Sequence, residues 1–70
     1  MLPLSLADPG EEVVVRRVGG SPDVKKHLED LGFTAGSTAT VITSLNGNVI
    51  VKVRESRVAI SDEMARKIMV

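Results

Sequence analysis

The sequence contains no cysteine, tryptophan or tyrosine, and its only aromatic residue is Phe33. The absence of cysteine excludes a disulfide framework, a thiolate metal site and a cysteine nucleophile. With a single aromatic residue, the core must be built from Val, Ile, Leu, Ala and Met, which suits a compact β-rich barrel better than a fold with a large pocket. We therefore expect one small domain that spans residues 1–70 and has no roomy active site.

The charged residues balance, with nine basic and nine acidic side chains. The chain therefore lacks the positive excess that binding to a phosphate backbone requires, and nucleic acid is a disfavoured partner. The N-terminal residues show no basic region followed by an apolar run, and no stretch approaches the roughly 20 apolar residues that span a bilayer. We expect a cytoplasmic protein that is not inserted in a membrane.

The first 18 residues predict a single helical turn and then a strand. In residues 5–10, Ser5 is an expected N-cap, and Pro-Gly ends the turn. Residues 11–18 are rich in valine and predict a strand. Val18 falls out of strict alternation, which indicates a bulge or a bend in this strand.

The segment after Gly20 predicts one short helix. Ser21 is expected to cap its N-terminus, with proline at the first helical position. Gly32 is expected to end the helix with a positive φ, and Phe33 to seal that end onto the barrel. The predicted buried stripe has the spacing i, i+4 and i+7 and consists of Val24, Leu28 and Leu31.

Residues 37–44 and 48–53 predict a β-hairpin. A two-residue Asn-Gly turn would pair Ile42 with Val51. A three-residue loop instead pairs Ile42 with Ile50 and places one consistent apolar set inward. We therefore predict the three-residue loop, with its glycine in the left-handed region. The predicted pairs are Ala39 with Val53, Val41 with Val51, and Ile42 with Ile50.

The C-terminal residues predict a short strand, a short helix and a closing strand. The strand is expected over residues 57–60, with Val58 and Ile60 inward. Ser61 is the expected cap of the helix, and residues 69–70 are expected to close the barrel. The predicted buried stripe of the helix consists of Met64, Ala65 and Ile68.

Four segments carry this order of elements: DPGEEVVV (8–15), KKHLEDLGFTAG (25–36), VIVKVR (49–54) and RVAISDEMARKIMV (57–70). Together they resemble the ferrous iron transport protein A (FeoA) family over nearly the whole chain. The resemblance implies a mainly β fold: a small SH3-like barrel of about five strands, with a short helix after the first strand and a short C-terminal helix. The same domain resembles the C-terminal domain of regulators of the diphtheria toxin repressor type.

Residues suited to metal binding are few and scattered. Transition-metal sites need convergent histidine and carboxylate ligands, but the chain has one histidine, His27. Its acids occur as sequence neighbours at 11–12, 29–30 and 62–63, and neighbouring side chains diverge on helices and strands alike. We interpret His27 as a boundary residue of the helix, with the body of its ring against the protein, and predict no metal ligands.

Residues suited to catalysis are better explained by structure. The segment GGSP (19–22) lacks the Gly-Lys-Ser/Thr ending of a phosphate-binding loop, so we interpret it as a turn and a helix cap. Ser5, Ser21 and Ser61 are likewise predicted caps rather than nucleophiles. We predict that the protein is not an enzyme and that it binds no cofactor.

The remaining candidate is a docking patch on the outside of the predicted barrel. Its apolar centre and basic rim would suit an apolar and acidic partner surface. The alternative is that these are ordinary scattered surface residues. Recognition of proline-rich peptides is improbable without tyrosine or tryptophan. The predicted partner-binding residues are Ile42, Ile50, Lys52, Arg54, Val14 and Arg16.

The resemblance implies a role beside a membrane transporter. We predict a non-catalytic accessory or regulatory protein of ferrous iron uptake that docks on ferrous iron transport protein B, whose cytoplasmic part is a GTPase. The alternative is an SH3-like accessory domain that binds a divalent transition metal ion weakly through surface carboxylates and His27. The contacted region of the transporter, any effect on GTP turnover, and weak self-association stay open.

Overall fold

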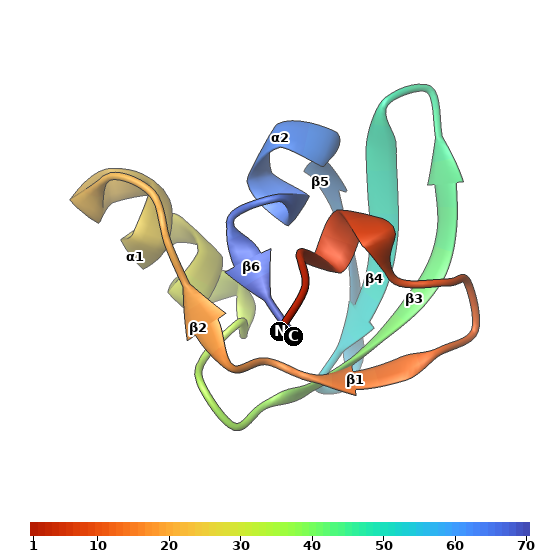
Figure 1. Cartoon of the computed structure of the whole chain (residues 1–70), viewed down its shortest axis with the longest axis horizontal. Helices are drawn as coiled ribbons and strands as arrows, with labels where there is room; N and C mark the ends of the chain where they lie inside the picture. The colour runs from red at the N-terminus through yellow and green to blue at the C-terminus, as the bar shows by residue number, and fades with distance from the viewer.

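Six short strands and two helices follow one another in the computed structural model, which describes every residue from Met1 to Val70 (Figure 1). A 3₁₀ turn precedes the first strand. The elements in chain order are η1 (Leu4–Leu6), β1 (Glu12–Val14), β2 (Arg17–Val18), α1 (Pro22–Leu31), β3 (Thr38–Leu45), β4 (Asn48–Val53), β5 (Ser56–Ser61), α2 (Asp62–Ala65) and β6 (Ile68–Met69).

The strands form two antiparallel sheets. One has four strands in the order β1-β3-β4-β5, and the other pairs β2 with β6. The two ends of the chain lie side by side, because Leu2 N–H donates to the Val70 carbonyl at 3.1 Å and Val70 N–H donates to that of Leu2 at 2.8 Å (Figure 1). The predicted mainly β fold is confirmed, with one strand more than the five expected.

The additional strand arises because residues 11–18 change sheet in the middle. Val15 N–H donates to the Ser37 carbonyl at 2.8 Å, whereas Arg16 N–H donates to that of Met69 at 2.7 Å. The backbone therefore leaves the four-stranded sheet and joins β6 within one residue. This is the bend that the position of Val18 predicted, and Val18 is buried at 7% exposure.

Local residues define both ends of α1, as predicted. Ser21 Oγ accepts a hydrogen bond from Val24 N–H at 3.3 Å, which satisfies one free donor of the first turn. Gly32 ends the helix at φ 114°, and Phe33 N–H donates back to the Leu28 carbonyl at 3.0 Å. The latter bond is the backward hydrogen bond of a Schellman ending.

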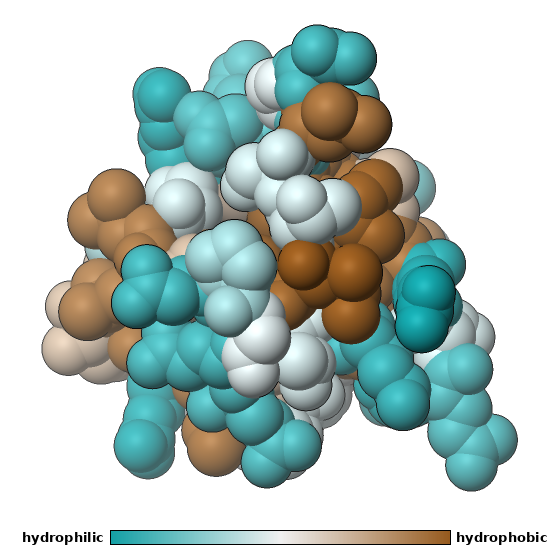
Figure 2. Space-filling view, turned by 90° about the vertical axis from the view of Figure 1, so that its right-hand side faces the viewer, coloured by the Kyte–Doolittle hydropathy of each residue, from teal (hydrophilic) through white to brown (hydrophobic).

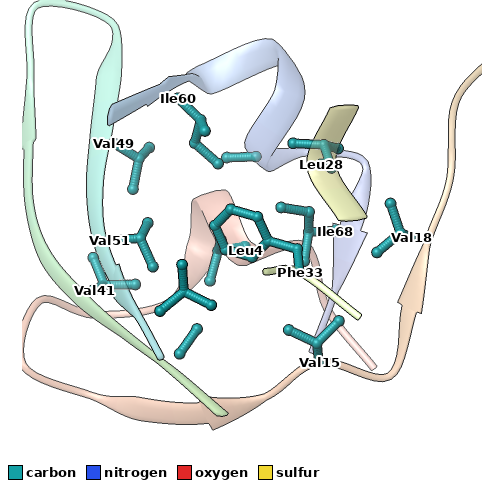
Figure 3. Close-up of a cluster of buried hydrophobic side chains, with 13 residues drawn as sticks. Leu4, Val15, Val18, Leu28, Phe33, Val41, Val49, Val51, Ile60 and Ile68 are labelled. Carbon is teal, nitrogen blue, oxygen red and sulfur yellow. The ribbon is translucent and has the colours of Figure 1, made fainter. Parts of the chain in front are cut away.

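Phe33 lies at the centre of the apolar core (Figure 3). Its ring is fully buried and lies between the valines of the sheet and Leu28 of α1. The predicted role of Phe33 as a seal at the end of the helix is confirmed. Leu4, which is also fully buried, was not in the predicted core.

The β3–β4 hairpin differs from its prediction in register. Ala39 and Val41 have their predicted partners, but Thr43 rather than Ile42 lies opposite Ile50. Ile42 is therefore an extra residue in β3, a β-bulge. Pairing continues to Leu45 and Asn48, so the tip is a two-residue turn.

The predicted three-residue loop is therefore wrong. The tip consists of Asn46 and Gly47, with positive φ angles of 52° and 79° that match a type I′ turn. The left-handed conformation predicted for Gly47 is confirmed. The bulge shifts the register by one residue, which allows the short turn and the inward apolar set to coexist.

Two further predictions at the ends of the chain need correction. The first turn begins after Pro3, and no side chain caps it, so Ser5 is not an N-cap. The C-terminal helix ends at Ala65, and Ile68 reaches the core from β6 rather than from a helical stripe. The Ser61 cap is confirmed, because Ser61 Oγ accepts from Met64 N–H at 3.1 Å.

Candidate functional site

The outer face of the four-stranded sheet carries polar and charged side chains. In β4, buried Val49, Val51 and Val53 alternate with half-buried Ile50 and exposed Lys52. Successive side chains of a strand point to opposite faces, so Ile50 and Lys52 point away from the core together. Neither belongs to the buried cluster or to the residues that pack against it.

Lys52 lies within a row of four side chains that crosses the whole sheet. The register places Glu12 beside Thr40, Thr40 beside Lys52, and Lys52 beside Arg57. Lys52 and Arg57 are thus like charges directly opposite each other, an arrangement that destabilises a sheet. Neither of them forms an ion pair, since the one salt bridge of the structure joins two residues of the α2 region.

Arg54 adds a third cation at the end of β4. Its backbone has φ 57°, a left-handed conformation that is uncommon for a bulky side chain and costs about 1–2 kcal/mol. Its side chain lies close to the end of α1, because a Cβ placed on Gly32 would be 3.4 Å from Cδ and Nε of Arg54.

A hollow of about 340 Å³ lies on this outer face. Its lining combines two cations and one carboxylate with hydroxyl groups, and it has no apolar side chain. Such a lining offers hydrogen bonds and positive charge to a partner surface, and it lacks the apolar walls of most small-molecule pockets. The lining residues are Glu12, Ser37, Thr38, Thr40, Lys52 and Arg54.

Four of the six predicted docking residues lie on this face of the sheet or at its end, and two of them line the hollow. Ile50 and Lys52 share the face, Arg54 lines the hollow, and Val14 is 40% exposed opposite Thr38. The other two are placed differently. The predicted outward pair of Ile42 with Ile50 is wrong because Ile42 is the bulge residue.

Arg16 lies apart from this face. It lines a different hollow between β2 and α1, because the chain changes sheet at Val15 and Arg16. Sequence reasoning also missed Arg57, whose place opposite Lys52 depends on the register of β4 and β5. The structure connects β4 to β5 through Arg54 and Glu55 alone. Without a glycine or asparagine there, the sequence carries no signal for that short turn and its register.

His27 is exposed on α1 and does not belong to the buried stripe of the helix. The reason is that α1 contacts the barrel along a narrow stripe, in which only Leu28 is fully buried while Val24 and Leu31 are half-buried. No three His, Asp or Glu side chains of the structure form a group that could hold a metal ion.

On the side of the molecule seen in Figure 2, apolar residues gather right of centre and again at the left. The side of the molecule that carries the β3–β4 hairpin shows separate apolar patches, with polar and charged side chains between them (Figure 2). Neither α1 nor α2 has the length and apolar character that a membrane-crossing helix needs. The most exposed large apolar residues are Met1, Leu2, Leu6, Val14 and Leu45.

Two small antiparallel sheets that curl around one core, with helices after β2 and β5, define an SH3-like barrel. Comparison with known protein families identifies the family to which the chain belongs. The family model of the FeoA domain matches residues 2–70. The chain therefore belongs to the FeoA family, and the predicted resemblance is confirmed.

Individual relatives agree with this assignment. A protein of Methanocaldococcus jannaschii named "Putative Fe(2+) transport protein A" is 39% identical over 70 residues, which cover 100% of this chain and 85% of the relative. The crystal structure of an iron uptake regulatory protein (FeoA) matches with a TM-score of 0.88 at 31% sequence identity. The matched region covers 96% of this chain and 89% of that protein's chain.

Two more distant structures share the fold. FeoA of Stenotrophomonas maltophilia, solved as a complex with zinc, matches with a TM-score of 0.86 at 20% sequence identity. The matched region covers 99% of this chain and 88% of the S. maltophilia chain. A manganese-dependent transcriptional repressor has a TM-score of 0.86 at 19% identity, over 94% of this chain but 38% of the repressor. The likeness to a domain of such regulators is thus also confirmed.

Proposed function

We propose that this chain is a non-catalytic accessory protein of ferrous iron uptake, and that it docks from the cytoplasmic side on ferrous iron transport protein B. Its family and the name of its M. jannaschii relative support the role in ferrous iron transport. The observation that carries the docking surface is the directly opposed pair of Lys52 and Arg57, with Arg54 beside it and no carboxylate paired to any of them.

The repulsion between Lys52 and Arg57 gives a physical reason for a partner. Carboxylates on a docked surface would interact favourably with both cations and remove the unfavourable contact between them. Ile50 lies next to this pair on the same face and supplies apolar area that binding would bury. We infer that the partner surface is acidic around a small apolar patch.

Arg54 supports the same surface through its backbone. A glycine would adopt the left-handed conformation of this residue without strain, yet the chain has an arginine there. Strain at a side chain with no packing role in the core is typical of a functional site. A favourable interaction of the Arg54 charge with a partner would offset this backbone strain.

Calorimetric titration against the purified cytoplasmic region of the transporter tests the proposal. We expect Lys52→Glu to weaken binding by about tenfold or more, because it places a negative charge opposite an acidic surface. Lys26→Glu is the matched control, since it makes the same change in charge on the exposed side of α1. Equal affinities of these two folded variants would contradict the docking surface.

A second pair of variants separates binding from stability. Arg54→Gly should relieve backbone strain and raise stability by up to about 1 kcal/mol while it weakens binding. Asn46→Gly changes another residue with positive φ, at the hairpin tip outside the hollow, and should leave binding unchanged. A stabilised Arg54→Gly variant with full affinity would exclude Arg54 from the interface.

A further inference from the structure

A second hollow, of about 420 Å³, lies between β2 and α1. We call it the basic hollow. Its lining includes the backbone of Gly19 and Gly20, and cations from two elements of the chain face it. These cations are Arg16, Arg17 and Lys25.

The bend in the chain brings these cations together. Arg16 lies at the break between β1 and β2, where its N–H donates to the Met69 carbonyl, and Arg17 pairs with Met69 in the second sheet. The chain then turns at its two glycines and enters α1, whose first turns present Lys25 to the same hollow. Lys67 adds a further cation at the edge, since its Cδ would lie 3.0 Å from a Cβ placed on Gly20.

The concentration of positive charge in the basic hollow is local. The chain as a whole has equal numbers of acidic and basic residues, but a single carboxylate, that of Glu29, lines this hollow beside the three cations. None of the three forms a salt bridge with Glu29 or with any other carboxylate. Three cations that repel one another around an open space leave room for an anion between them.

We propose that the basic hollow binds a phosphate-bearing anion. Arginine presents a planar fork of N–H donors that matches two oxygens of a phosphate, and lysine supplies a point charge. The N–H group of Gly20, which lines the hollow, donates to no acceptor within the protein and adds a neutral donor to the lining. The site is formed by residues of two segments, 16–20 and the first turns of α1, that line one hollow, and the Ser21 cap of α1 is a separate feature.

The lining favours a small anion over a protein partner. Docked proteins usually bury a central aromatic or large aliphatic anchor. The docking surface has half-buried Ile50 on the same face as its hollow, whereas the apolar lining of the basic hollow is limited to buried Val18 and to Ala35. The shared chemistry is the phosphate group, which a soluble phosphate compound or the headgroup of an anionic phospholipid would supply. The docking surface proposed above is formed by other residues, so the two proposals stand or fall separately.

Two-dimensional NMR of the whole chain tests the proposal with inorganic pyrophosphate as the probe. We expect saturable shifts at the amides of residues 16–20 and of Lys25. Arg16→Gln combined with Arg17→Gln should weaken this binding by about tenfold or more, because each removes a charge-assisted hydrogen bond. Lys52→Gln combined with Arg57→Gln is the matched control and should leave the affinity unchanged.

A second arm distinguishes the sources of the phosphate group. Sedimentation with vesicles that contain phosphatidic acid, compared with pure phosphatidylcholine vesicles, reports binding to a lipid headgroup. A saturable response that the Arg16 and Arg17 variant loses, in either arm, supports the proposal and identifies the source. Lys25→Gln repeats the test if the double variant is unfolded by circular dichroism. No saturable response in either arm, or an equal loss in the Lys52 and Arg57 control, overturns it.

Discussion

Helix α1 and the β3–β4 hairpin both have residues of positive φ at a boundary, but different interactions determine the two boundaries. In α1, Gly32 and Phe33 close hydrogen bonds to carbonyls of the same helix. In the hairpin, the turn at Asn46 and Gly47 is local, but the position of the bulge at Ile42 depends on which side chains of both strands face the core. A helix end is thus a local structure, whereas a strand register is a tertiary one.

The largest expected loss of stability concerns the packing of α1. It tests whether local interactions, which determine the ends of this helix, are also enough to keep it folded. Leu28 is the one fully buried residue of α1. We expect Leu28→Ala to lower the free energy of unfolding by about 2–5 kcal/mol, because it leaves a cavity in the core. Urea unfolding followed by circular dichroism measures the change.

Lys26→Ala is the control for this experiment, because Lys26 is exposed on the same helix and the change also yields a good helix former. We expect its stability to stay within about 0.5 kcal/mol of the parent chain. A Leu28→Ala variant as stable as Lys26→Ala would mean that the caps alone hold α1.

A smaller effect is expected at the end of α1. Gly32→Val should cost more than about 1 kcal/mol, because Gly32 has φ 114° and a β-branched residue is strained there. A Cβ would also approach Val53 Cγ2 to 3.3 Å. Gly36→Val separates the two causes, because Gly36 has φ 91° but no atom within 4 Å of an added Cβ. Equal losses of stability in the two variants would show that backbone strain alone, and not the contact with Val53, destabilises Gly32→Val.

The smallest effect is expected from the deletion of Ile42. Without this extra residue, β3 and β4 form a regular ladder with the same inward side chains, so stability should change by less than about 1 kcal/mol. Cross-strand NOEs between residues 39 and 53 report the register. Deletion of Ile50 is the control, because Ile50 is paired with residues of both β3 and β5. Its loss would exchange the inward and outward side chains in the rest of β4. Loss of the 39–53 contacts on deletion of Ile42 would show that the bulge is essential to the register.

The candidate docking face was partly predictable. Alternation along β4 placed Ile50 and Lys52 outside, because valines occupy every second position of that strand. The opposed pair of Lys52 and Arg57 was not predicted, since it depends on the pairing of β4 with β5. The misplaced Arg16 shows the same limit, because the position of Val18 predicted a bend but not that the chain changes sheet at Arg16.

The sequence by itself determined the features that depend on neighbouring residues. These are the Ser21 and Ser61 caps, the glycine that ends α1, and the inward valines of β4. A cap or a turn requires only that residues a few positions apart form a hydrogen bond or adopt one backbone conformation.

Tertiary structure decided the features that join distant segments. It placed the bulge at Ile42, divided residues 11–18 between two sheets, and brought Arg17 and Lys25 to one hollow. In each case several local arrangements are acceptable to the backbone. The choice among them is made by burial of a single apolar set around Phe33, because a one-residue shift of register would turn that set toward water.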